Sequence, residues 1–154
     1  MQFVPLILVA AVASTSSLAL CAGPQLSPTE VTSAFKAAGY KLKGKKWFAC
    51  AEGQVGEVRD INGDGLPEVI ITEGGSECHG MTGEGYSLVS KQSSGTWKLM
   101  SGGTGIPLFL KSQGIGGWPD LQVGGPGFCF PVLRWNGQKY DLHHYEYEGK
   151  RCKP

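Results

Sequence analysis

The spacing of apolar residues changes once along the chain, after its first third. Before that point, apolar side chains recur at intervals of three and four from Val31 to Ala38, which places them on one face of an α-helix. Ser27 and Glu30 stand in the register of a capping box, with a proline between them at the first helical position. The pattern predicts one N-terminal helix over about 28–38.

After this segment, apolar residues alternate with polar ones or form short runs separated by Gly, Ser and Asn. A period of two is typical of β-strands, and the sequence "WNGQK" carries the Asn-Gly signal of a tight hairpin. The pattern predicts strands at 47–51, 57–60, 68–72, 86–91, 97–101, 120–123, 129–135 and 140–145.

Two stretches of the chain repeat each other. "LPEVIITEGG" (66–75) and "WPDLQVGG" (118–125) share an apolar-Pro-acid-apolar opening and a Gly-Gly ending, and a similar hairpin follows each. The repeat predicts two three-stranded units, about 58–101 and 112–145, which pack together because neither is stable alone. The expected fold class is mainly β (α+β), with two tandem three-stranded antiparallel units and one N-terminal helix, stapled by disulfides.

Composition narrows the range of functions. The chain has 154 residues, of which 24 are glycine, and its formal net charge is +1. This length predicts a single β-rich domain over 23–154. The small net charge provides no field that would steer nucleic acid, so no nucleic-acid partner is expected.

The first residues, "MQFVPLILVAAVASTSSLALCAG", have the pattern of a secretory signal peptide over 1–22. A membrane span is the alternative, but the unbroken apolar run is about half of the roughly 20 residues that a span needs. We therefore expect an exported protein, periplasmic or secreted, with no transmembrane span in the mature chain.

Cysteine usage supports the same compartment. Cleavage after Ala22 would leave four cysteines, which are expected to form two disulfides in an exported protein: Cys50, Cys78, Cys129 and Cys152. Three connectivities are open. The similar places of Cys78 and Cys129 after the two Gly-Gly endings weakly favour a bond between them, leaving Cys50 to Cys152. Alternatively, "LALC" resembles a bacterial lipobox, and Cys21 would carry a lipid anchor.

The two repeats differ in the loop that precedes each of them. "DINGDG" precedes the first copy and "SQGIGG" the second. When the copies are aligned on their Pro-acid pairs, only the last acid is retained, as Asp120 for Glu68. Glycine-rich chemistry therefore suffices for the second turn, and the acids of the first loop indicate a separate task.

That task is predicted to be calcium binding. Ca²⁺ takes several oxygen ligands in a flexible cage, and the loop "DINGDGLPE" offers one at every second position: Asp60, Asn62, Asp64, the Leu66 carbonyl and Glu68. A glycine stands where such a loop bends. The alternative is a tight turn whose Asp and Asn side chains accept hydrogen bonds from local backbone N–H groups.

The loop resembles the calcium loops of FG-GAP and VCBS-type repeats, found in integrin α propeller blades, which pass directly into a β-strand. This resemblance covers roughly 58–72 and implies a structural Ca²⁺ held by the five residues named above. It extends to the loop and not to a propeller, because two copies are too few. The whole chain is also similar to small, uncharacterised exported bacterial proteins with the phrases "GGPGFCFP" and "RWNG".

Other candidate sites favour structural roles. Adjacent Cys78 and His79 are expected to point apart on an extended segment. On the strand "HHYEYE", His144, Glu146 and Glu148 share one face and could bind a transition metal, but a solvated face is the preferred interpretation. The tryptophans could stack on sugars but are more typical of a core: Trp47, Trp97, Trp118 and Trp135.

The preferred function is a non-catalytic binding or structural module that meets an envelope or extracellular protein, or a glycan, through exposed loops such as 76–85 and 101–109. The first alternative is a small periplasmic hydrolase that uses Glu73, Glu77 and His79. The second alternative is an inhibitor or immunity protein that binds an envelope partner.

Overall fold

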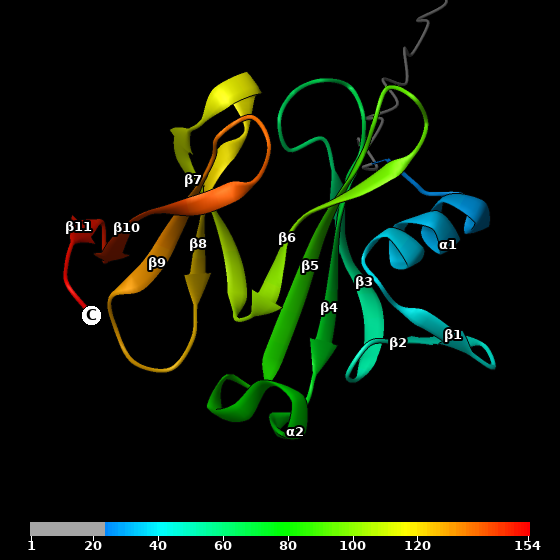
Figure 1. Ribbon diagram of the computed structural model, residues 1–154, viewed down its shortest axis with the longest axis horizontal. Helices are drawn as coiled ribbons and strands as arrows, with labels where there is room; N and C mark the ends of the chain where they lie inside the picture. The colour runs from blue at the N-terminus through cyan, green and yellow to red at the C-terminus, as the bar shows by residue number, and fades with distance from the viewer. Residues whose placement is uncertain (1–23) are drawn as a thin grey trace, which may run out of the picture.

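A computed structural model describes residues 24–154, so the predicted signal peptide and Cys21 lie outside the described residues. The chain is mainly β, with two antiparallel sheets (Figure 1). The first sheet contains β1 (Lys41–Lys43), β2 (Lys46–Phe48), β3 (Glu52–Arg59), β4 (Glu68–Gly74), β5 (Glu84–Lys91) and β6 (Trp97–Thr104), in that order. The second has the order β11 (Lys150–Arg151), β10 (Tyr140–Tyr147), β9 (Phe130–Trp135), β8 (Pro119–Gly124), β7 (Ile106–Gln113).

Two short helices complete the fold, α1 (Pro28–Ala37) and α2 (Ser76–His79). The predicted capping box of α1 is confirmed, because the Glu30 amide donates to the Ser27 hydroxyl and the Glu30 carboxylate accepts from the Ser27 amide. Within residues 24–154, no helix has the length and apolar character needed to cross a membrane.

Both faces of the first sheet are covered, one by α1 and the other by the second sheet. Alternate residues of its strands point to opposite faces, so a single strand such as β4 contributes to both contacts. Val69 and Ile71 pack under α1 with Phe35, whereas Ile70 and Leu88 face the second sheet. The apolar core between the two sheets is formed by buried residues from both of them: Ile70, Tyr86, Leu88, Met100, Trp118, Leu121, Trp135 and Tyr140. This common apolar cluster joins the two sheets.

The prediction of two three-stranded units is not confirmed, because the sheets have six and five strands. The strands of the repeats are β4–β6 in one sheet and β8–β10 in the other, and each set is extended by neighbouring strands. The predicted exposed loop 101–109 is wrong, since it forms the end of β6 and the start of β7. Gly105 lies between these strands at φ 140°, and its amide donates to the Glu84 carbonyl.

The weakly favoured disulfide pairing between the copies is also wrong. Cys50 bonds to Cys78, and Cys129 bonds to Cys152. Strand pairing explains this connectivity: Gly53 lies opposite Glu73 on β3 and β4, which brings the flanking cysteines together. The Cys152 amide likewise donates to the Tyr145 carbonyl on β10, so the chain end returns to its own sheet.

Candidate functional site

Loops from both sheets gather at one end of the molecule, the upper end in Figure 1. They surround a cleft of about 360 Å³, lined among others by Asp64 from the β3–β4 loop, Trp118 before β8 and Gly137 after β9. The β3–β4 loop and the β7–β8 turn touch, because a side chain at Gly117 would lie 2.5 Å from the Asn62 carbonyl oxygen. The predicted calcium loop therefore stands beside its counterpart in the second repeat.

The loop is organised by its own acidic and amide side chains. Asp60 Oδ1 accepts from the amides of Gly63 and Asp64 at 2.7 and 3.2 Å, and Asp60 Oδ2 accepts from Gly65 at 2.8 Å. Asp64 accepts hydrogen bonds from the Leu66 amide and from the Asn62 side chain. These are the local turn interactions that the sequence offered as the alternative to calcium ligation.

Glu68 begins β4 and is fully buried. Its Oε2 accepts from the Ile61 amide at 2.7 Å, and its Oε1 accepts from the Ser90 hydroxyl at 2.8 Å. Burial raises the pKa of Glu68, and the charges of Asp64 and Asp60 act in the same direction. The three carboxylates therefore repel one another at the start of this strand.

None of these three carboxylates has a cationic partner among residues 24–154, because no ion pair of the described chain includes Asp60, Asp64 or Glu68. Asp60 and Asp64 are exposed and can be screened by water, whereas Glu68 is not accessible. An ionised carboxylate without a counter-ion is costly to bury. The loop thus carries a negative charge that the described chain leaves without compensation.

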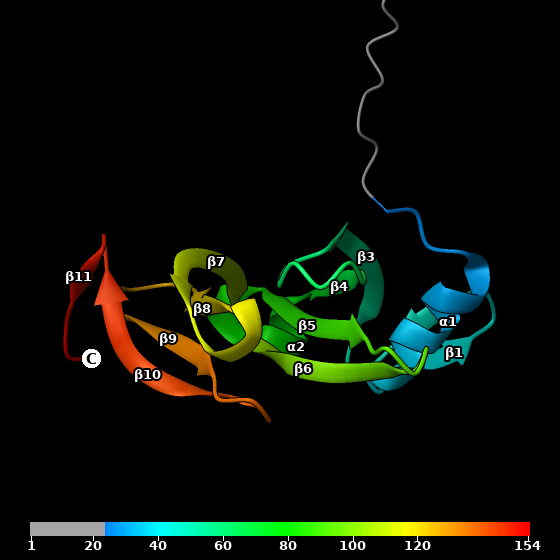
Figure 2. The same ribbon diagram turned by 90° about the horizontal axis from the view of Figure 1, so that it is seen from above.

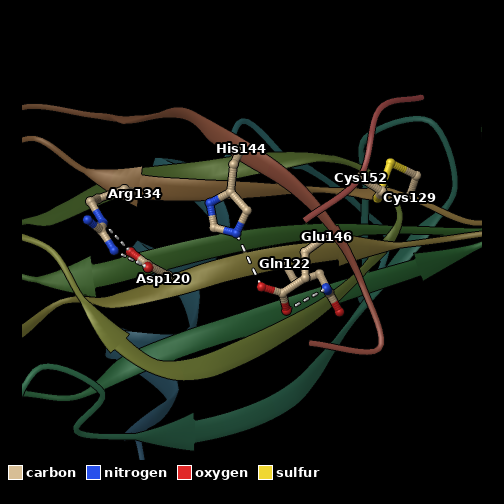
Figure 3. A network of polar contacts seen from close by, with 7 residues as sticks. All are labelled: Asp120, Gln122, Cys129, Arg134, His144, Glu146 and Cys152. Carbon is tan, nitrogen blue, oxygen red and sulfur yellow. Dashed lines mark hydrogen bonds and ion pairs between the residues drawn. A yellow bond between two sulfur atoms is a disulfide. The ribbon is translucent and has the colours of Figure 1, made fainter. Parts of the chain in front are cut away.

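The second repeat treats its buried acid differently. Asp120, also fully buried, receives two hydrogen bonds from Arg134, Nε to Oδ1 at 2.8 Å and Nη2 to Oδ2 at 2.6 Å (Figure 3). This bidentate pair holds the pKa of Asp120 below its ordinary value, against the effect of burial. The carboxylate of the second copy is therefore neutralised by a side chain of its own sheet.

The strand register shows that these two arrangements are equivalent. Glu68 lies directly opposite Ser90 on the neighbouring strand β5. In the second sheet, Leu121 lies opposite Leu133, which brings Asp120 beside Arg134 on β9. Serine thus occupies the place of the arginine. Neither Ser90 nor Arg134 is among the predicted site residues, although the hairpins that follow the two Pro-acid pairs align these two positions with each other.

The chemistry of the loop fits a hard divalent cation. The five predicted ligands offer oxygen alone, and the three carboxylates carry the negative charge that Ca²⁺ prefers. Their present geometry does not gather them around one point: within residues 24–154, no group of three His, Cys, Asp or Glu side chains is placed to hold a metal. Lone pairs remain on Asp60 Oδ2 and on the oxygens of Asp64 and Glu68, each of which accepts one hydrogen bond.

A second polar cluster lies near the Cys50–Cys78 disulfide. His79 belongs to α2, so the predicted extended segment is wrong. Its Nε2 lies 3.4 Å from Glu73 Oε1, and its Nδ1 lies 3.1 Å from the Thr104 hydroxyl. The Ala51 amide fixes the other Glu73 oxygen, and the absence of a side chain at Gly85 leaves room for the imidazole. Glu77 makes none of these contacts.

The predicted His/Glu/Glu face on β10 is only partly formed. His144 Nε2 lies 3.2 Å from Glu146 Oε2, and Gln122 donates to the same carboxylate (Figure 3). Glu148 lies beyond the end of β10 with φ 49°, so it does not continue this face. A bulge between Leu142 and His144 alters the alternation of the strand, and the imidazole rings of His143 and His144 are 4.9 Å apart.

The tryptophans take core positions. Trp118 and Trp135 are each 7% exposed in the cluster between the sheets, and Lys98 covers the ring of Trp135 at 5.2 Å. Trp47 and Trp97 pack, partly buried, against the cluster under α1. All four tryptophans therefore contribute to packing, as the sequence favoured.

Comparison with protein-family models, with curated proteins and with solved structures found no match for this chain.

Proposed function

We propose that this chain is an exported binding module in which a structural calcium ion organises the β3–β4 loop. Asp60, Asn62, Asp64, the Leu66 carbonyl and Glu68 would hold the ion. The observation that supports the proposal is the buried Glu68 carboxylate, which has Ser90 where the equivalent Asp120 has Arg134. Calcium would supply the positive charge that the second repeat obtains from an arginine.

Export is part of the same proposal. The two disulfides are consistent with an oxidising compartment, where calcium is available to weak sites. The calcium would stabilise the cleft end of the molecule, because the loop contacts the β7–β8 turn at Gly117. The loops around that cleft would then be held in position for a partner.

Thermal unfolding of the chelated protein tests the calcium site. A weak extracellular-type site has a Kd of about 10⁻⁴–10⁻³ M, so 10 mM Ca²⁺ would stabilise the fold by about 1.4–2.7 kcal/mol. Asp64→Ala should abolish this gain. Asp141→Ala is the matched control, because Asp141 is a partly exposed acid of the second sheet and should leave the gain unchanged. Equal melting temperatures with and without calcium would contradict the proposal.

A hydrolase is a second candidate function, favoured by the chain of contacts Glu73–His79–Thr104. In this reading, Thr104 Oγ attacks an ester carbonyl while His79 Nδ1 takes the hydroxyl proton, and Glu73 stabilises the resulting imidazolium. The alcohol leaves with that proton, and water then hydrolyses the acyl-threonine. Release of nitrophenol from nitrophenyl acetate should fall to background in Thr104→Val and persist in Thr96→Val, and equal rates in both variants would exclude this function.

A further inference from the structure

The basic residues of the chain are concentrated at one end. Residues 36–46 contain five of the 14 basic residues and none of the 13 acidic ones. The other nine basic residues accompany all 13 acids, so this segment has a formal charge of +5 and the remainder −4. Although the net charge is only +1, positive charge is therefore concentrated in one segment and negative charge in the rest of the chain.

The β1–β2 hairpin gives this charge a defined surface. Lys41 lies opposite Phe48, and Lys43 lies opposite Lys46, so these four side chains share one face of the hairpin. The opposite face carries Trp47, whose ring stacks on Phe35 of α1 at 5.2 Å. Because that face is turned toward the helix, the lysine face points away from the helix, and Lys45 stands in the exposed turn between the two strands.

Little on the described chain neutralises this surface. Lys46 pairs with Glu52 at 2.7 Å, but Lys41, Lys43 and Lys45 form no ion pair within residues 24–154. Lys43 lies over the ring of Phe48 at 5.3 Å, which sets a partly buried aromatic ring among the ammonium groups. Lysines beside an aromatic ring are typical of segments that lie at a membrane surface.

The start of the described chain lies at the same end. Figure 2 shows α1 and β1 together at one end of the molecule, and Pro24, the first described residue, precedes α1 by four residues.

We propose that the lysine face of the β1–β2 hairpin docks on a bilayer rich in anionic phospholipids. Phosphate groups would take the place of the missing acidic partners, and the ring of Phe48 would contact the headgroup region. This inference names a partner for the proposed binding module, but it does not depend on the calcium loop, which the unfolding experiment tests separately.

Vesicle co-sedimentation of the purified exported protein tests the inference in low salt with a chelator present. Binding to phosphatidylglycerol vesicles should exceed binding to phosphatidylcholine vesicles. Each lysine near an anionic surface contributes about fivefold to partitioning, so the variant Lys41→Gln, Lys43→Gln, Lys45→Gln should bind phosphatidylglycerol roughly a hundredfold more weakly. About 0.5 M salt should remove most of the difference between the lipids, because screening shortens the range of these charges.

The matched control is the variant Lys111→Gln, Lys139→Gln, Lys150→Gln, which loses the same charge from exposed positions elsewhere. It should bind like the unmodified protein, and both variants should retain the original melting temperature to within a few degrees. Equal loss in the two variants would show a non-specific charge effect and overturn the proposal. Equal binding to both lipids, or retention by a sulfated polysaccharide column without vesicle binding, would overturn it as well.

Discussion

Glu68 and Asp120 occupy the same place in the two repeats, yet they are stabilised in different ways. Each follows a proline, lies within the first two residues of its strand and is fully buried. Asp120 is paired with a fixed cation, Arg134, whereas Glu68 is held by a serine hydroxyl and a backbone amide. The difference teaches that one fold position can keep a buried acid either with an internal counter-ion or, as we propose, with an external one.

The largest expected effect comes from removing the internal cation. Arg134→Met leaves Asp120 buried without a partner, which costs about 3–5 kcal/mol for a fully buried pair. Because the Arg134 side chain is 37% exposed, we expect a loss of about 2–3 kcal/mol in urea unfolding. The double variant with Asp120→Asn should recover part of this loss. Unchanged stability of Arg134→Met would show that the pair does not balance the buried charge.

The contact between the two loops is the next target. Gly117 has φ 76°, and a side chain there would approach the Asn62 carbonyl oxygen. Gly117→Ala should therefore cost about 2 kcal/mol through backbone strain and displacement of the loop, and it should weaken calcium binding. Gly95→Ala shares the positive φ but has open space around it, so it should cost only about 1 kcal/mol and leave calcium binding intact.

The variant Glu68→Gln tests directly whether the buried Glu68 carboxylate, which has no cationic partner in the described chain, destabilises the fold. In chelator, this variant should be more stable than the unmodified protein by about 1 kcal/mol, because it removes a buried charge. Its amide oxygen can still accept from the Ile61 amide, and the Ser90 hydroxyl can accept from the new NH2 group. Asp120→Asn should instead be destabilising, since Arg134 would lose its carboxylate. Guanidinium unfolding of both variants at neutral pH would measure the contrast, and a change of the same sign in both would contradict it.

The smallest effect is the pH dependence of the Asp120 pair. Arg134 lowers the pKa of Asp120 below its unfolded value of about 3.8, and His143 also faces this carboxylate. The stabilisation is then present above the unfolded pKa and is lost as pH falls through the lower folded pKa. The difference in stability between the unmodified protein and Asp120→Asn should shrink between pH 6 and pH 3. A difference that widens toward low pH would reverse this assignment.

Local signals in the sequence predicted local structure well. The capping box at Ser27 located α1, and the Asn-Gly turn located the β9–β10 hairpin. β7 was not predicted, because Pro107 and the glycines before it are typical of a loop. Proline is nevertheless compatible with an edge strand, which is the position of β7 in the second sheet. The disulfide connectivity could not be predicted from the sequence either, because it depends on which cysteines the strand pairing brings together.

In the candidate site, too, the local features could be predicted from the sequence and the long-range contacts could not. The loop residues could be named from spacing alone, because alternating oxygens around glycine have a local signature. Ser90 and Arg134 could not, since their importance depends on lying across a strand from a buried acid. The contact of Thr104 with His79 joins positions 25 residues apart, and no local pattern encodes it.

The most direct test of the account is isothermal titration of the chelator-treated, disulfide-intact protein with Ca²⁺. One ion per chain should bind with a Kd of about 10⁻⁴–10⁻³ M, and Asp64→Ala should show no binding heat. A folded protein that takes up no calcium at millimolar concentrations would contradict the central claim, and Glu68 would then be a buried acid held by hydrogen bonds alone.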